Sequence, residues 1–82
     1  MTEKKIIVNT VFDSRPASLL VQTAGTFVSK ISISMDEKTA NAKSIMGIVS
    51  LGISEGQMIT LTAEGSDEKQ AVPAIEQFFL VK

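Results

Sequence analysis

The sequence predicts an α+β domain, an open-faced β-sandwich with the element order βαββαβα, in which a four-stranded antiparallel sheet has three helices on one face. Two hydrophobic patterns support this class. Apolar residues alternate with polar ones in KISISM (30–35) and QMITLTAE (57–64), as in half-buried strands, and after Pro16 they recur at helical steps. No linker, repeat or low-complexity segment interrupts the 82 residues, so we expect a single domain over residues 1–82.

The first strand and the first helix are predicted from adjacent segments of different composition. Lys4–Asn9 is short and rich in β-branched residues, which favour strands. Asp13 and Ser14 can both cap the start of the following helix, and Pro16 suits its first helical position. The apolar residues beyond this start share one face of an amphipathic helix: Ala17, Leu20, Val21, Ala24 and Phe27.

Three further strands complete the predicted sheet. Lys30–Met35 and Lys38–Ala42 should form a hairpin, because Asp36 and Glu37 between them favour a turn. Gln57–Glu64 follows a Ser-Glu-Gly turn and alternates apolar with polar residues, so it is the fourth strand.

The segment Asn41–Gly52 (NAKSIMGIVSLG) predicts a short helix with an exposed apolar surface. Ser44 is a good N-cap, and Gly52 suits the left-handed position that ends a helix. The helix between them has about two turns, and a 3.6-residue period cannot turn all its apolar residues inward. Part of its apolar area should therefore meet solvent. The residues concerned are Ile45, Met46, Ile48, Val49 and Leu51.

A final helix is predicted near the C-terminus. Ser66 can cap it, with Asp67 and Glu68 in its first turn. Pro73 should kink this helix or weaken its first turn, because a proline in a helix interior removes a hydrogen bond. The predicted buried stripe consists of Ala71, Ile75, Phe78 and Phe79.

Composition excludes several classes of function. Histidine and cysteine are absent, which excludes zinc and haem sites, histidine-based triads, cysteine nucleophiles and phosphohistidine, so we expect no metal and no cofactor. Eight basic residues against nine acidic ones favour neither nucleic acid nor an anionic membrane as a partner. No apolar run approaches the roughly 18 residues of a membrane span, and the N-terminus lacks a signal-peptide core. We therefore expect a cytoplasmic protein whose partners are proteins.

Two segments carry recognisable motifs. Val11–Ala17 reads VFDSRPA, and Asn41–Gly47 reads NAKSIMG, with Ser50–Gly52 continuing the second motif. Both resemble the HPr family, the small phosphocarrier proteins of the bacterial sugar phosphotransferase system, and in particular its Gram-positive branch. The family pattern at the first motif is G-L-H-A-R-P-A, so Arg-Pro-Ala is retained and the histidine is replaced by Asp13. The resemblance covers essentially the whole chain and implies the HPr-like sandwich, with the two motifs adjacent in space.

Asp13 stands in the position of the family's phosphohistidine. That histidine accepts a phosphoryl group from Enzyme I and passes it on through a labile N–P bond, which a carboxylate cannot form. An acyl phosphate usually needs a Mg²⁺ site, and Asp13 beside Arg15 does not make one. An ester on Ser14 would be too stable for transfer. Two simpler interpretations remain: Asp13 is a helix cap, which we favour, or a fixed negative charge in the place of phosphohistidine.

The retained serine and the lost histidine resemble the Crh-type regulatory proteins of this family, although those have Gln where this chain has Asp13. The resemblance implies that Ser44 is phosphorylated by HPr kinase/phosphorylase, and that the phosphoprotein is a corepressor for the catabolite control regulator CcpA. It implies a phosphate-supporting role for Arg15. The residues implied to be apolar partner contacts are Ile45, Met46 and Leu51.

Three hypotheses follow from these residues. The preferred one is a non-enzymatic regulatory protein that acts in carbon catabolite repression. The alternative is a phosphocarrier of the sugar phosphotransferase system, with Asp13 as phosphoacceptor and with Enzyme I and sugar-specific components as partners. The third is a protein that keeps only the fold, or a private subunit of another complex. On spacing alone, Ser44 would be a plain helix cap, and only the resemblance gives it a regulatory role.

Overall fold

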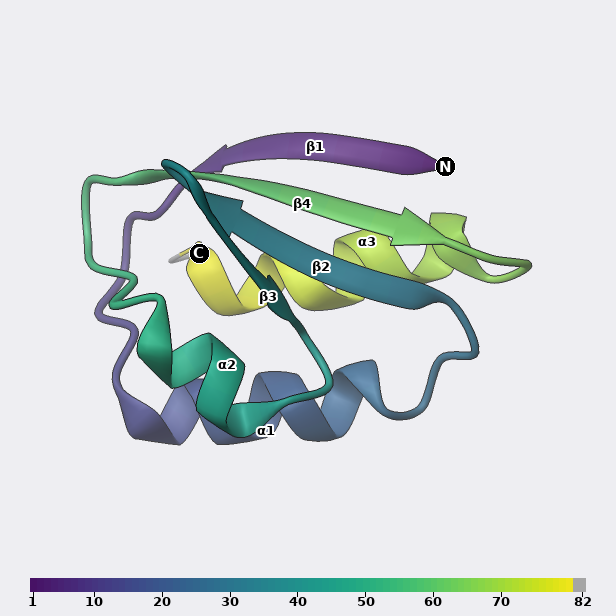
Figure 1. Ribbon diagram of the computed structural model, residues 1–82, viewed down its shortest axis with the longest axis horizontal. Helices are drawn as coiled ribbons and strands as arrows, with labels where there is room; N and C mark the ends of the chain where they lie inside the picture. The colour runs from purple at the N-terminus through teal and green to yellow at the C-terminus, as the bar shows by residue number, and fades with distance from the viewer. Residues whose placement is uncertain (81–82) are drawn as a thin grey trace.

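The computed structural model describes residues 1–80 and confirms the predicted element order. The elements are β1 (Thr2–Ile7), α1 (Ser14–Ala24), β2 (Lys30–Met35), β3 (Lys38–Asn41), α2 (Ile45–Ser50), β4 (Met58–Glu64), α3 (Glu68–Glu76) and a short 3₁₀ helix, η1 (Gln77–Phe79). The four strands form one sheet, and the three α-helices lie together on one side of it (Figure 1). The predicted α+β open-faced sandwich is the fold of this protein.

The strands lie in the order β1-β4-β2-β3, and every neighbouring pair is antiparallel. The register aligns buried residues across the sheet: Ile6 faces Ile59, and Ile33 lies between Leu61 on one side and Ala40 on the other. Because side chains alternate along a strand, these residues share the face that the helices cover. The opposite face of the sheet meets solvent and carries mostly polar residues, together with exposed Ile7 and Met58.

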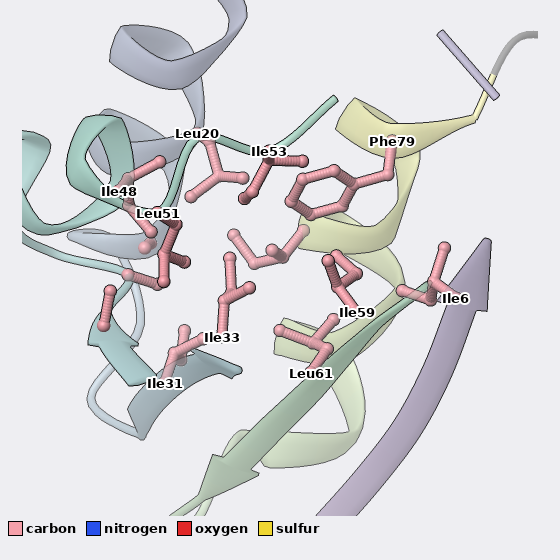
Figure 2. Close-up of a cluster of buried hydrophobic side chains, with 14 of the residues drawn as sticks. Ile6, Leu20, Ile31, Ile33, Ile48, Leu51, Ile53, Ile59, Leu61 and Phe79 are labelled. Atoms are coloured by element: carbon pink, nitrogen blue, oxygen red, sulfur yellow. The ribbon is translucent and has the colours of Figure 1, made fainter. Parts of the chain in front are cut away.

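The hydrophobic core fills the space between this face and the helices. Figure 2 shows Ile33, Ile59 and Leu61 of the sheet pointing toward Leu20 of α1 and Phe79 of η1. These side chains are essentially inaccessible to solvent. All three α-helices contribute apolar residues to this one cluster, so a single core holds them against the sheet.

The first strand begins and ends two residues earlier than Lys4–Asn9, the predicted range. Val8 stays beside the residues that precede β4, since its N–H donates to the carbonyl of Gln57 at 2.9 Å. The backbone then turns away, and Asn9 N–H donates to the carbonyl of Phe79 at 2.9 Å. The β-branched run therefore continues past the end of the strand and leads the chain toward η1.

The predicted capping role of Ser66 is wrong. Asp67 is the residue at the N-cap of α3, and its carboxylate makes no capping bond within the helix. It accepts instead from Val28 N–H at 2.9 Å, from Ser29 N–H at 3.0 Å and from the Ser29 hydroxyl. The Ser29 hydroxyl, followed by the backbone N–H of Val28, lowers the pKa of Asp67. Gly65 allows this close approach, since a Cβ at its position (φ 154°) would lie 2.6 Å from the Ser29 hydroxyl.

Acidic residues of α3 hold the N-terminal strand. The carboxylate of Glu68 accepts from the Thr2 hydroxyl and pairs with the Met1 ammonium group at 3.2 Å, while Glu76 pairs with Lys4 at 2.7 Å. The Thr2 hydroxyl is the main cause that lowers the pKa of Glu68. The β1 edge of the sheet is thus tied to α3 as well as to β4.

Pro73 lies inside α3 and does not end it. The helix continues for three residues beyond the proline and then tightens into η1. Of the predicted stripe, Ala71, Ile75 and Phe79 are buried, whereas Phe78 is only partly buried against the core. The 3₁₀ turn therefore places Phe79, rather than Phe78, in the centre of the core.

Candidate functional site

The first part of the site is the start of α1, which Asp13 caps. Asp13 has extended backbone angles (φ −96°, ψ −161°), and its Oδ1 accepts from the N–H of Arg15 at 3.2 Å. Its own carbonyl accepts from Ala17 N–H at 3.2 Å, which begins the helix. The structure confirms the interpretation of Asp13 as a helix cap. One carboxylate oxygen is thus occupied in stabilising the first turn.

The second part is the start of α2, where Ser44 has the same role. Ser44 is extended (φ −114°, ψ 114°), and its Oγ accepts from the N–H of Gly47 at 3.2 Å. The helix ends at Ser50, and Gly52, two residues later, has a φ of 66°, the left-handed conformation predicted for it. Both predicted limits of this helix are confirmed. The Ser44 side chain is only partly exposed, so a modifying enzyme must meet the residues around it as well.

The apolar residues of α2 separate into an exposed and a buried face. Ile45, Met46 and Val49 are 40%, 74% and 53% exposed, whereas Ile48 and Leu51 are buried in the core. The prediction that apolar area of this helix meets solvent is confirmed. Leu51, however, is 4% exposed, so its predicted place on the partner-binding surface is wrong. The exposed α2 patch consists of Ile45, Met46 and Val49.

Val49 could have been found from the sequence by helical spacing. Val49 lies four residues after Ile45 and three after Met46, on one side of the helix, whereas Ile48 and Leu51 are three residues apart on the other. The family motif directs attention to the first residues of the helix, and the helical period identifies the third exposed one.

The two helix starts lie at opposite ends of a packed helix pair, as Figure 1 shows for α1 and α2. A hollow of about 120 Å³ separates the start of α1, at Asp13 and Ala17, from the end of α2, at Val49 and Gly52. At the other end, Lys43 Nζ donates to the carbonyl of Phe27, three residues beyond α1, at 2.8 Å. The helices are therefore antiparallel, and Ser44 lies toward the C-terminal end of α1.

This arrangement separates Arg15 from Ser44. Arg15 is exposed in the first turn of α1, and within residues 1–80 its guanidinium makes no hydrogen bond or ion pair. The basic residue beside Ser44 is Lys43, which sequence reasoning did not single out although it is the preceding residue. The predicted phosphate-supporting role of Arg15 stays a prediction.

Phe12 of the first motif lies against the core. Phe12 packs against Phe79, with ring centroids 4.8 Å apart, so this residue joins the start of α1 to the core.

Across the part of the chain that the structure describes, no three acidic side chains gather where they could hold a metal ion. None of its helices is long and apolar enough to span a membrane.

Comparison with known proteins agrees with both motifs. The family model described as the PTS HPr component phosphorylation site matches residues 2–80. The chain belongs to the HPr family. Members of this family are phosphocarrier or regulatory proteins, and their fold is the four-stranded antiparallel sheet with three helices described above.

Both branches of the HPr family are among the similar proteins. The HPr-like protein Crh of Halalkalibacterium halodurans is 49% identical over 80 residues, which are 95% of each chain. The phosphocarrier protein HPr of Bacillus anthracis has a TM-score of 0.91 at 46% identity, over 96% of each chain. The catabolite repression protein Crh of Bacillus subtilis, a domain-swapped dimer, has a TM-score of 0.77 at 40% identity, over 90% of this chain and 85% of its own. Similarity alone therefore does not separate the two branches, and the site residues must do so.

Proposed function

We propose that this HPr-family protein is a regulator of the Crh type and not an enzyme or a phosphocarrier. HPr kinase/phosphorylase phosphorylates it on Ser44, and the phosphoprotein is the corepressor partner of a CcpA-type transcription regulator in carbon catabolite repression, in the cytoplasm. The observation that carries this proposal is the contrast between the two helix starts. Ser44 retains a phosphorylatable hydroxyl, whereas the phosphohistidine position holds Asp13, which caps α1.

The geometry at Asp13 supports the loss of phosphoryl transfer. No histidine occurs anywhere in the 82 residues, so no phosphohistidine can form. An acyl phosphate on Asp13 would take one carboxylate oxygen from a group that already accepts a bond from Arg15 N–H. The Arg15 guanidinium is the only charged side chain in α1, and one cation does not balance a phosphoryl group as a metal site does.

The geometry at Ser44 supports phosphorylation. In this step the Ser44 oxygen attacks the γ-phosphorus of ATP, the hydroxyl proton leaves to a base of the kinase, and ADP departs. The hydroxyl accepts from Gly47 N–H in the unmodified protein, and α2 contains no acidic residue that would repel the product. A phosphate at this place carries about −1.5 to −2 charge at the positive end of a helix, so the fold should tolerate it.

Recognition of the phosphoprotein would combine charge with apolar contact. The α2 patch of Ile45, Met46 and Val49 begins directly after Ser44 and lies on the surface. A regulator that offers a cation beside an apolar groove would gain charge-assisted hydrogen bonds to the phosphate while it buries this patch. A surface built to accept neutral Ser44 would be repelled by the same phosphate.

The proposal is tested by two parallel phosphorylation reactions followed by intact mass measurement. The chain is incubated with Enzyme I and phosphoenolpyruvate, and separately with HPr kinase/phosphorylase and ATP. We expect one phosphoryl group from the kinase, removed by Ser44→Ala, and none from Enzyme I. A hydroxylamine-sensitive phosphoryl group formed by Enzyme I and removed by Asp13→Asn would instead establish the phosphocarrier alternative, with Enzyme I and sugar-specific components as partners.

A further inference from the structure

We propose that Lys43 is the positioning residue of the phosphoserine switch: once Ser44 is phosphorylated, the Lys43 ammonium group leaves the carbonyl of Phe27 and pairs with the phosphate. This inference rests on the proposed phosphorylation of Ser44 and adds to it the residue that receives the new charge. It replaces Arg15, to which the family resemblance points, by a residue that the structure places at the correct end of the helix pair.

The backbone around Lys43 is fixed by a tight turn. Ser44 N–H donates to the carbonyl of Asn41 at 3.0 Å, and Lys43 N–H donates to the side-chain oxygen of the same Asn41 at 2.9 Å. The Lys43 Cα is thus held one residue, about 3.8 Å, from the Cα of Ser44. Its side chain is exposed, and four methylene groups let the ammonium group exchange partners without any change in the backbone.

The present partner of Lys43 is a weaker acceptor than a phosphate. Lys43 Nζ donates to the Phe27 carbonyl at 2.8 Å, which is a bond from a cation to a neutral oxygen. A phosphoserine offers three oxygens and nearly two negative charges, so it adds the attraction between opposite charges to the hydrogen bond that a neutral carbonyl already provides. Neither of the two ion pairs within residues 1–80 involves Lys43, since they join Met1 to Glu68 and Lys4 to Glu76.

Arg15 is poorly placed for the same task. The hollow at Asp13 and Ser14 is lined by the end of α2, whereas Ser44 caps its start, and the six residues of the helix rise about 9 Å between the two. Lys43 directly precedes Ser44, whereas Arg15 lies in the first turn of α1, at the other end of the helix pair.

The exchange should have a local structural consequence. When Lys43 leaves, the Phe27 carbonyl loses the charged donor that Lys43 provides. The rest of the loop between α1 and β2 stays in place, because Asp67 continues to hold the N–H groups of Val28 and Ser29. The change is therefore expected at one carbonyl group and not as a loosening of the fold.

The test uses full-length protein with phosphoserine installed at position 44 during translation, so that it does not depend on any kinase. Phosphorus NMR gives the second pKa of the phosphate, and carbon NMR follows the Phe27 carbonyl. In the wild type we expect the phosphate pKa to lie below its ordinary value near 6, and Lys43→Met should raise it by roughly half a unit. The Phe27 carbonyl shift of the phosphorylated wild type should match that of unphosphorylated Lys43→Met.

Two matched variants decide the outcome. Lys69→Met removes an exposed lysine of α3 and should leave both readings unchanged, whereas Arg15→Met should change the phosphate pKa much less than Lys43→Met. The proposal is overturned if Lys43→Met leaves the phosphate pKa unchanged, or if Arg15→Met raises it more. Failure of kinase or CcpA to recognise the protein would contradict the proposed function but would not alter these NMR readings.

Discussion

The starts of α1 and α2 are capped in the same way, but their capping side chains differ in chemistry. At α1 the Asp13 carboxylate accepts from an N–H group two residues ahead, and at α2 the Ser44 hydroxyl accepts from one three residues ahead, both at 3.2 Å. Either side chain satisfies a free donor of the first turn. Only the hydroxyl, however, can also take a stable phosphate. One capping residue can therefore replace another with little effect on the helix. The ability of the position to carry a stable phosphate, however, depends on which residue is present.

The largest expected effect is on phosphorylation, and it distinguishes Ser44 from Asp13. Ser44→Ala should abolish phosphorylation by HPr kinase/phosphorylase, because the accepting oxygen is gone, while Asp13→Ala should remain a substrate. Incorporation of labelled phosphate from ATP measures both. Circular dichroism of each variant serves as the control for folding. Comparable phosphorylation of Ser44→Ala would mean that the accepting serine lies elsewhere.

The second effect separates the two faces of α2. Leu51→Ala should cost about 2–5 kcal/mol of stability because it opens a cavity in the core. Met46→Ala removes an exposed side chain and should change stability by less than about 0.5 kcal/mol. The same Met46→Ala change should nevertheless weaken binding of the phosphoprotein to CcpA at least fivefold, or about 1 kcal/mol. Urea unfolding and calorimetry give the two numbers, and a loss of stability without a loss of binding in Met46→Ala would reverse the assignment of the faces.

The third effect measures the cap at Asp13 itself. Asp13→Ala should cost about 0.5–2 kcal/mol, since it leaves a first-turn N–H group without its partner, and Asp13→Asn should cost less. Thermal unfolding of the three proteins provides the measurement. If both variants melt with the wild type but bind a partner differently, Asp13 acts as a fixed charge in the place of phosphohistidine rather than as a cap.

The smallest expected effect comes from Asp67, at the start of α3, and is a pH-dependent change in stability. Hydrogen bonds from Ser29 and Val28 lower the pKa of Asp67 below its ordinary value of 3.8. Its contribution to stability is therefore present above about pH 4 and is lost as the pH falls through the lowered pKa. The difference in urea midpoint between the wild type and Asp67→Asn should be constant near pH 7 and shrink below pH 4. A difference that persists unchanged to pH 2 would show that the carboxylate charge does not stabilise this loop.

Much of the fold could be predicted because the decisive features are local. The alternation in Lys30–Met35, the cap at Ser44 and the left-handed Gly52 each depend on residues within one element, and the structure confirms all three. The start of α3 could not be predicted in this way. Ser66 and Asp67 are both good caps by type, and the outcome depends on Ser29, which lies 38 residues from Asp67 in sequence.

The site was predictable in its residue types more than in its spatial relations. Ser44, Ile45 and Met46 lie where the motif places them, at the start of α2 and on its exposed side. The burial of Leu51 and the separation of Arg15 from Ser44 depend on how α2 packs against the sheet and α1. Packing between elements distant in sequence is not encoded in a short motif, so these relations required the structure.

Binding of CcpA to this protein tests the regulatory account most directly. Calorimetry would compare the unmodified protein, the protein phosphorylated on Ser44, and Ser44→Ala treated with the kinase and ATP. The account predicts that only the phosphorylated protein binds tightly, and that Ser44→Ala behaves as the unmodified protein does. Equal affinity of CcpA for all three would contradict the switch and leave Ser44 as a helix cap.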